Sequence, residues 1–150
     1  MTEKEIIEGC IYKKISCQKE LFNQYSGRLM TICLRYLNNK SEAEDTLQDA
    51  FINIFKNIHF YKFQGSFEGW MWKIVVNCTL KKLSKKNIKY DEVIDENINI
   101  SSQQTDALQY MGEKELLQLI KSLPDGYRTV FNLYVIEEYS HEEIAAILNI

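Results

Sequence analysis

The chain has 150 residues, of which 45% are apolar and 26% charged, with a net charge of −3. No apolar run approaches the roughly 20 residues of a membrane span, and the N-terminus lacks the apolar segment of a secretory signal. The four cysteines form no CxxC pair and no zinc-ligand pattern with the histidines. These features predict a cytoplasmic protein with reduced thiols, no metal site and no membrane insertion.

The charge is unevenly distributed along the chain. Residues 1–90 carry 15 Lys and Arg against 9 Asp and Glu, whereas residues 91–150 carry 3 against 12. Six lysines fall within residues 73–89, a stretch of 17 residues without a carboxylate. The asymmetry indicates two functional halves, of which only the first suits a polyanionic partner.

Residues 1–89 are predicted to form one helical domain. Apolar side chains recur at helical spacing from Leu21 to Tyr36, and residues 38–40 form a break. Ser41 stands three residues before Glu44, a capping-box pattern that predicts the start of a second helix reaching Ile58.

A third helix is expected after the loop at residues 60–65. Ser66 is the predicted N-cap, and the helix should run to about Lys86. Its buried stripe is predicted to consist of Phe67, Trp70, Met71, Ile74 and Cys78.

Residues 90–105 are acidic and then rich in Asn, Ser, Gln and Thr, and they predict a flexible linker. Residues 106–150 resume a helical pattern, with an apolar face before Pro124 and a capping box at Ser140 and Glu143. Three short helices with tight turns are typical of the opening of a helix-turn-helix. The predicted fold class is therefore all-α, with an N-terminal helical bundle and a C-terminal partial helix-turn-helix domain.

The second predicted helix has one unusual face. At 100° per residue, the buried side should contain Ala43, Leu47, Ala50, Phe51, Ile54 and Ile58. The opposite side holds Asp45, Gln48 and Asp49 around Ile52. An apolar residue ringed by polar groups is typical of a protein-contact patch, but a solvated face with one exposed isoleucine explains the pattern better when it is taken alone.

The third predicted helix carries a nucleic-acid signal. Lys73, Asn77 and Lys81 share one side, with Lys85 near the end. Lysines at this spacing can follow phosphates, and the aromatic and amide side chains of residues 60–65 suit unpaired bases. A lysine-rich solvated helix end explains the lysines equally well. No Gly-rich phosphate loop, nucleophile motif or HExxH pattern is present, so neither an enzyme nor a cofactor is predicted.

Two motifs resemble a known family. Residues 43–51 (AEDTLQDAF) and 66–77 (SFEGWMWKIVVN) resemble region 2 of the extracytoplasmic-function (ECF) sigma factors of bacterial RNA polymerase. Residues 123–131 (LPDGYRTVF) and 139–145 (YSHEEIA) resemble the opening of region 4. The two motifs stand in the family's order, with an acidic segment between them.

The resemblance implies a transcription initiation factor that is not an enzyme. Its partners would be core RNA polymerase, through the β′ clamp helices and the β flap, and promoter DNA, with an anti-sigma factor as a further partner. The polymerase-binding residues implied are Asp45, Gln48, Asp49 and Ile52, which reverses the interpretation of that face. The residues implied to hold melted −10 DNA are Phe63, Gln64, Ser66, Lys73, Asn77, Lys81 and Lys85.

The sequence departs from the family at its end. Ile150 stands where the resemblance places the turn before the recognition helix, so region 4 as given (residues 106–150) is expected to lack the helix that reads the −35 element. Either the sequence is cut at this point or the natural protein does not read that element. Lysines occupy basic positions where arginines are common, and lysine provides no bidentate fork. The alternative is a helical adaptor that binds polymerase or a regulator without recognising promoters.

Overall fold

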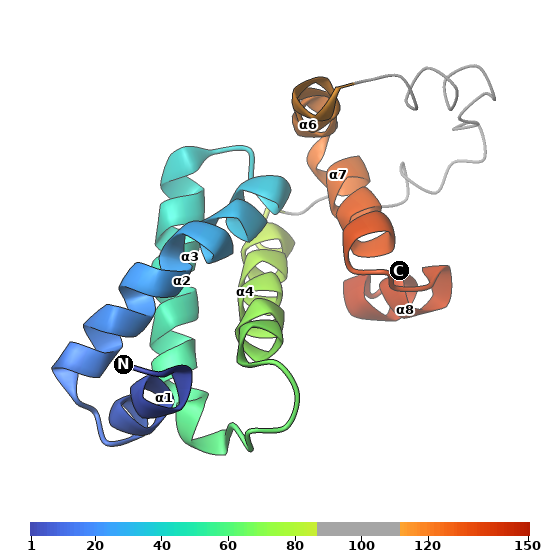
Figure 1. Ribbon diagram of the computed structural model, residues 1–150. Coiled ribbons are helices and arrows are strands. Elements are labelled where there is room, and N and C mark those ends of the chain that lie inside the picture. The colour runs from blue at the N-terminus through green and yellow to red at the C-terminus, as the bar shows by residue number, and fades with distance from the viewer. Residues whose placement is uncertain (87–111) are drawn as a thin grey trace. The chain divides into compact units, whose positions relative to one another are not determined.

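The computed structural model describes residues 1–86 and 112–150 (Figure 1). All regular elements in these ranges are helical, which confirms the all-α prediction. The α-helices are α1 (Glu3–Ile11), α2 (Ile15–Tyr36), α3 (Lys40–Asn57), α4 (Phe67–Ser84), α6 (Glu113–Ser122), α7 (Asp125–Phe131) and α8 (His141–Leu148). A 3-10 turn, η1 (Ile58–Phe60), follows α3, and a π-helical turn, η3 (Asn132–Ile136), follows α7.

Contacts between residues divide the chain into two compact units, residues 1–84 and 85–150. The predicted linker at residues 90–105 lies outside the described residues, so the three-part division into residues 1–89, 90–105 and 106–150 stays a prediction. Within the described ranges, no helix combines the length and the apolar character that crossing a bilayer requires.

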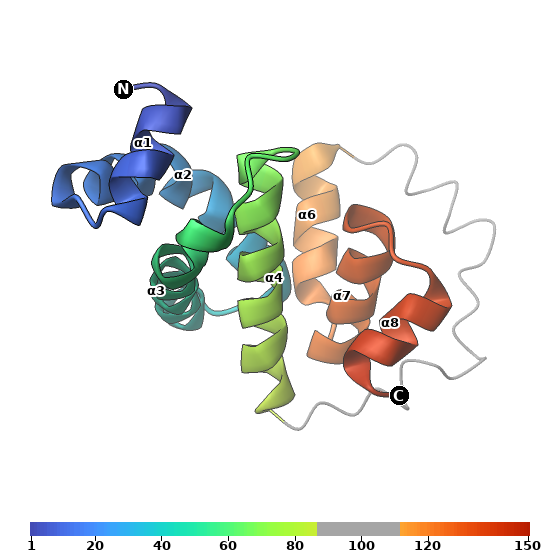
Figure 2. The same ribbon diagram turned by 90° about the horizontal axis from the view of Figure 1, so that it is seen from below.

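In the first unit, α2 packs against α1, α3 and α4. Helices α3 and α4 pack on each other and run in opposite directions (Figure 1). Helix α1 packs on α2 and on η1, at the end of α3 that leads into the loop before α4 (Figure 2). The predicted buried face of this helix is confirmed, since its five residues in α3 and Ile58 in η1 are all at most 8% exposed. This face fixes which side of α3 is left for a partner.

The capping prediction for α3 was wrong by two residues. The N-cap is Asn39, whose side-chain oxygen accepts a hydrogen bond of 3.1 Å from the backbone N–H of Glu42. Ser41 lies inside the helix and is exposed. Asparagine caps a helix as well as serine does, so the Asn-Asn break itself supplied the cap.

Helix α1 was not predicted from the sequence, although it begins with the same capping signal. The Thr2 side chain accepts from the N–H of Glu5, and the Glu5 carboxylate accepts from the N–H of Thr2. The Ser66 cap of α4 and the Ser140 capping box of α8 were predicted correctly.

The predicted buried stripe of α4 was only partly correct. Phe67 and Met71 are buried, but Trp70, Ile74 and Cys78 are half-buried. The buried positions continue instead with Val75, Val76, Thr79 and Leu83. Because α4 packs against both α2 and α3, its buried arc is wide and apolar residues occur nearly all round it.

In the second unit, Arg128 is a buried structural residue at the start of α7. It is 2% exposed, donates to the carbonyl oxygen of Leu123 over 2.7 Å and forms an ion pair with Asp125. Pro124 is the N-cap of α7, as expected from a proline that tolerates the helix start. The contacts of Arg128 fix the turn between α6 and α7.

The apolar face predicted before Pro124 was only partly correct. Ile120 is buried, but Leu117 and Leu119 are each 42% exposed. The part of that face at residues 106–111 lies outside the described residues.

Candidate functional site

The first candidate surface is the outer face of α3. Asp45, Gln48 and Asp49 are exposed, and Ile52 is 51% exposed among them. Within the described residues, neither aspartate takes part in an ion pair. The structure thus brings the four predicted residues together as an acidic surface with an apolar centre, available to a partner.

A hollow beside Ile52 extends this face beyond the predicted residues. The cavity has a volume of about 590 Å³ and joins the end of α1, the start of α2 and the end of α3. Its lining includes Ile11 and Lys13 together with Phe55 and Lys56. Sequence reasoning missed the α1 side because no pattern within one helix reveals which other helix packs beside it.

The second candidate surface is a line of polar residues along α4. Lys73, Asn77 and Lys81 are exposed at intervals of four residues, and Lys85 is exposed just beyond the helix. Residues at this spacing lie above one another on a helix, with their Cβ atoms about 5–6 Å apart. No ion pair among the described residues involves these lysines, so their charge is available to phosphates.

The loop before α4 presents the remaining predicted residues. Residues 62–66 are all exposed, and Phe63 is 47% exposed. The Ser66 hydroxyl oxygen accepts a hydrogen bond of 3.1 Å from the N–H of Gly69. Because a hydroxyl has one proton and two lone pairs, Ser66 can cap α4 and still donate to a ligand.

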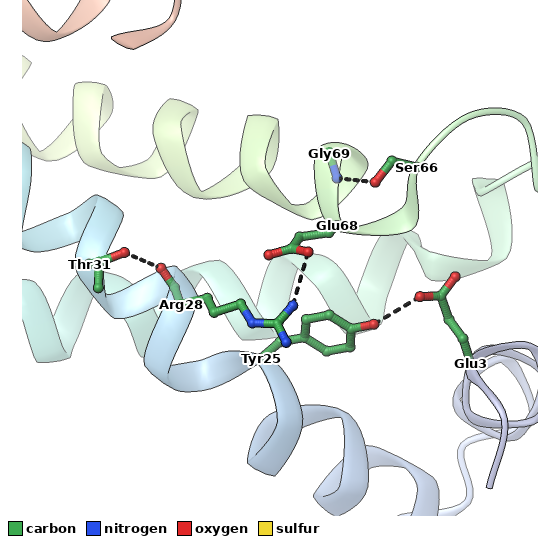
Figure 3. A network of polar contacts seen from close by, with 7 residues as sticks. All are labelled: Glu3, Tyr25, Arg28, Thr31, Ser66, Glu68 and Gly69. Carbon is green, nitrogen blue, oxygen red and sulfur yellow. Dashed lines mark hydrogen bonds and ion pairs between the residues drawn. The ribbon is translucent and has the colours of Figure 1, made fainter.

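Polar contacts near this loop connect three helices (Figure 3). The Arg28 guanidinium of α2 pairs with the Glu68 carboxylate in the first turn of α4, at 3.1 Å. The Tyr25 hydroxyl donates to Glu3 of α1 over 2.9 Å. Burial, and then the Glu3 contact, raise the pKa of Tyr25 to about 12, so this hydroxyl keeps its proton at neutral pH.

Cys10 and Cys33 are buried thiols rather than reactive ones. Burial, with a smaller effect from Cys17, raises the pKa of Cys10 to about 11, and burial, with a smaller effect from Cys78, raises that of Cys33 to about 12. Both are therefore protonated thiols at neutral pH, and the thiolate is the nucleophilic form. In the described part of the chain, no three metal-ligating side chains come together.

Comparison with known proteins decides the family. Residues 21–88 match the model of sigma-70 region 2, and residues 113–150 match that of sigma-70 region 4. The chain is 31% identical to the ECF RNA polymerase sigma factor SigW of Bacillus subtilis, in an alignment covering 87% of this chain and 76% of the relative. The chain belongs to the ECF family of sigma factors.

Two further relatives support this assignment. SigE of Mycolicibacterium smegmatis is 28% identical over 87% of this chain, which spans about half of that relative, 52%. SigM of Bacillus subtilis is 25% identical over 87% of this chain and 81% of its own length. The sigma factor described here is a transcription initiation factor that directs RNA polymerase to promoters, with core polymerase and promoter DNA as its partners.

The matched regions place both candidate surfaces within region 2. Helices α3 and α4 and the loop between them all fall inside residues 21–88. Helix α1 lies before this match, and α6, α7 and α8 lie inside the region 4 match.

Proposed function

We propose that the two surfaces of region 2 divide the work of the sigma factor. The outer face of α3 docks on the β′ clamp helices of core polymerase, and the loop at residues 62–66 with the polar line of α4 holds melted −10 promoter DNA. The docking residues are Asp45, Gln48, Asp49 and Ile52. The DNA-binding residues are Phe63, Gln64, Ser66, Lys73, Asn77, Lys81 and Lys85.

The observation that carries the DNA assignment is the continuity of loop and helix. The exposed loop leads directly into α4, whose outer side carries Lys73, Asn77 and Lys81 in line. A strand whose backbone follows the lysines can place an unpaired base against Phe63 and Gln64. Extruding a base requires a few kcal/mol, and stacking with phosphate contacts offsets that energy.

The chemistry of α3 supports docking on a protein. Its outer face is acidic and would repel DNA, whereas interface centres combine an apolar anchor with a polar rim. Ile52 has this arrangement, with half of its surface exposed between carboxylates and an amide.

Region 4 has a smaller role in this proposal. Its exposed apolar side chains, which include Val135 and Ile147, support contact with the β flap of polymerase. We place the protein in the cytoplasm with its polymerase and assign it no enzymatic activity, and an anti-sigma factor is a further partner in this proposal.

The test measures open-complex formation by core polymerase and the full chain on matched and altered −10 sequences across a salt series. Lys73→Ala and Lys81→Ala should weaken binding similarly for all sequences, and each should lower the salt slope by about one unit. Phe63→Ala, Gln64→Ala and Asn77→Ala should reduce opening or base preference more than total affinity.

Lys4→Ala, in α1, is the matched control and should leave both readouts unchanged, since Lys4 is exposed and lies outside the region 2 match. The division of labour is wrong if the lysine substitutions change base preference, or if the loop and Asn77 substitutions change neither opening nor preference.

A further inference from the structure

The loop before α4 is closed by one buried side chain, that of Tyr61. Its hydroxyl donates a hydrogen bond of 3.0 Å to the carbonyl oxygen of Gly65. Its ring centroid lies 5.2 Å from that of Phe67 and 5.6 Å from that of Trp70. Through these contacts, the Tyr61 side chain connects the end of the loop to the first turn of α4. Tyr61 is only 8% exposed, so it lies beneath the exposed loop residues.

The loop holds a backbone conformation that needs such support. Phe63 has a φ of 56° and Gly65 a φ of 76°, so two residues within three are left-handed. For a residue with a side chain, this conformation is unfavourable and persists only where surrounding contacts determine it. The ring centroids of Phe63 and Tyr61 are 5.2 Å apart. Tyr61 therefore contacts both left-handed residues, Phe63 through its ring and Gly65 through its hydroxyl.

We propose that Tyr61 is a positioning residue for base recognition, one that holds Phe63 and Gln64 in their binding geometry before DNA arrives. This inference rests on the proposed role of the loop in binding melted −10 DNA. A loop that is already ordered loses less conformational entropy on binding than one that must fold around the base. Contacts to bases determine sequence preference, whereas contacts to phosphates fix the position of the protein on the DNA. Because Tyr61 supports the residues that contact bases, it governs base preference rather than general attraction to DNA.

The decisive variant is Tyr61→Phe, which keeps the ring and removes only the hydroxyl. Holoenzyme assembled from core polymerase and the full chain is bound to premelted bubble DNA with a randomised −10 non-template strand. The ratio of preferred to average sequences should fall about two- to tenfold, the range expected for loss of one hydrogen bond. Binding to core polymerase and the salt slope should not change. Tyr12→Phe is the matched control, because Tyr12 is 79% exposed and far from the loop in sequence.

A second pair of variants disturbs the same turn without touching Tyr61. A Cβ at Gly65 would meet nothing within 4 Å, so Gly65→Ala acts only through the left-handed backbone. Gly65→Ala should reduce base preference as Tyr61→Phe does, while Gly65→Asn should retain most of it, because asparagine tolerates this conformation.

The outcomes separate this inference from the proposed function. If Phe63→Ala and Gln64→Ala leave base preference intact, the loop does not read bases and the proposed function fails. If those two reduce preference while Tyr61→Phe does not, only the positioning role is overturned. If Tyr61→Phe lowers polymerase binding and base preference together, the residue is merely structural, and the proposal is likewise overturned.

Discussion

Helices α3 and α4 have the same length, but their outer surfaces carry opposite charges. Each has 18 residues, and each packs against the other and against α2. Helix α3 exposes Asp45, Asp49 and Ile52, whereas α4 exposes Lys73, Asn77 and Lys81. The buried sides determine how the bundle packs, and in our proposal the oppositely charged outer sides determine which partner each helix binds.

The largest effect is expected on the outer face of α3. Asp49→Lys combined with Ile52→Glu reverses a charge and places a carboxylate at the apolar centre. If each behaves as an interface hot spot of about 2 kcal/mol, affinity for core polymerase should fall about a thousandfold. Co-purification with core polymerase measures the loss, and circular dichroism should remain helical.

Glu8→Lys is the matched control for that variant. Glu8 is an exposed carboxylate on α1, outside α3 and outside the lining of the hollow, and its reversal should leave polymerase binding largely intact. Equal losses for both charge reversals would mean that net charge, rather than this face, governs binding.

The second-largest effect is expected on stability, and it distinguishes the buried side of α4 from its outer side. Met71 is fully buried, so Met71→Ala should lower the free energy of unfolding by about 3 kcal/mol. Lys73→Ala, two residues away and exposed, should change it by less than about 0.5 kcal/mol. Urea unfolding of both variants makes the comparison, and a stable Met71→Ala variant would contradict the assigned core.

Alkaline pH should weaken the side of the bundle shared by α2 and α4. The pKa of Cys33 is raised from 9.0 to about 12, so the stability it contributes is full below pH 9 and is lost as pH rises toward 12. Between pH 9 and 11 the protein should lose about 2 kcal/mol from this thiol. Thermal unfolding across this range should show a shallower decline for Cys33→Ala, and identical slopes would refute the assignment.

The smallest effect distinguishes the observed cap of α3 from the one expected from sequence. Asn39→Ala removes the side chain that accepts from Glu42, and it should lower the free energy of unfolding by about 1 kcal/mol. Ser41→Ala should change it by less than about 0.5 kcal/mol, because that side chain caps nothing. The reverse order would restore the capping-box interpretation.

The sequence predicted α3 better than α4 for a physical reason. The polar and apolar residues of α3 alternate with one clear helical phase, so its buried and outer faces followed directly from the wheel. In α4, the run from Trp70 to Val76 is apolar on several sides, and the phase could not be read until its packing against both α2 and α3 was known.

The exposed residues of the candidate site were predictable from the sequence, but the contacts between its elements were not. Exposure of Ile52 and of the lysine line followed from periodicity and charge. The role of Tyr61 did not, because its hydrogen bond to Gly65 and its contact with Trp70 depend on how the loop folds back on α4. The α1 side of the hollow next to Ile52 depends in the same way on tertiary packing.

The division of roles between α3 and α4 is tested most directly by comparing one variant of each helix for polymerase binding and the α4 variant for DNA binding. The 150-residue chain carrying Asp49→Lys and Ile52→Glu, and the same chain carrying Lys73→Ala and Lys81→Ala, are each titrated with core polymerase. The α4 variant and the unsubstituted chain are then assayed, at saturating polymerase, for binding to premelted promoter DNA across salt. The α3 variant should lose polymerase binding, whereas the α4 variant should bind polymerase normally and show a DNA salt slope lower by about two units. Loss of polymerase binding in the α4 variant, or an unchanged salt slope, would contradict the account.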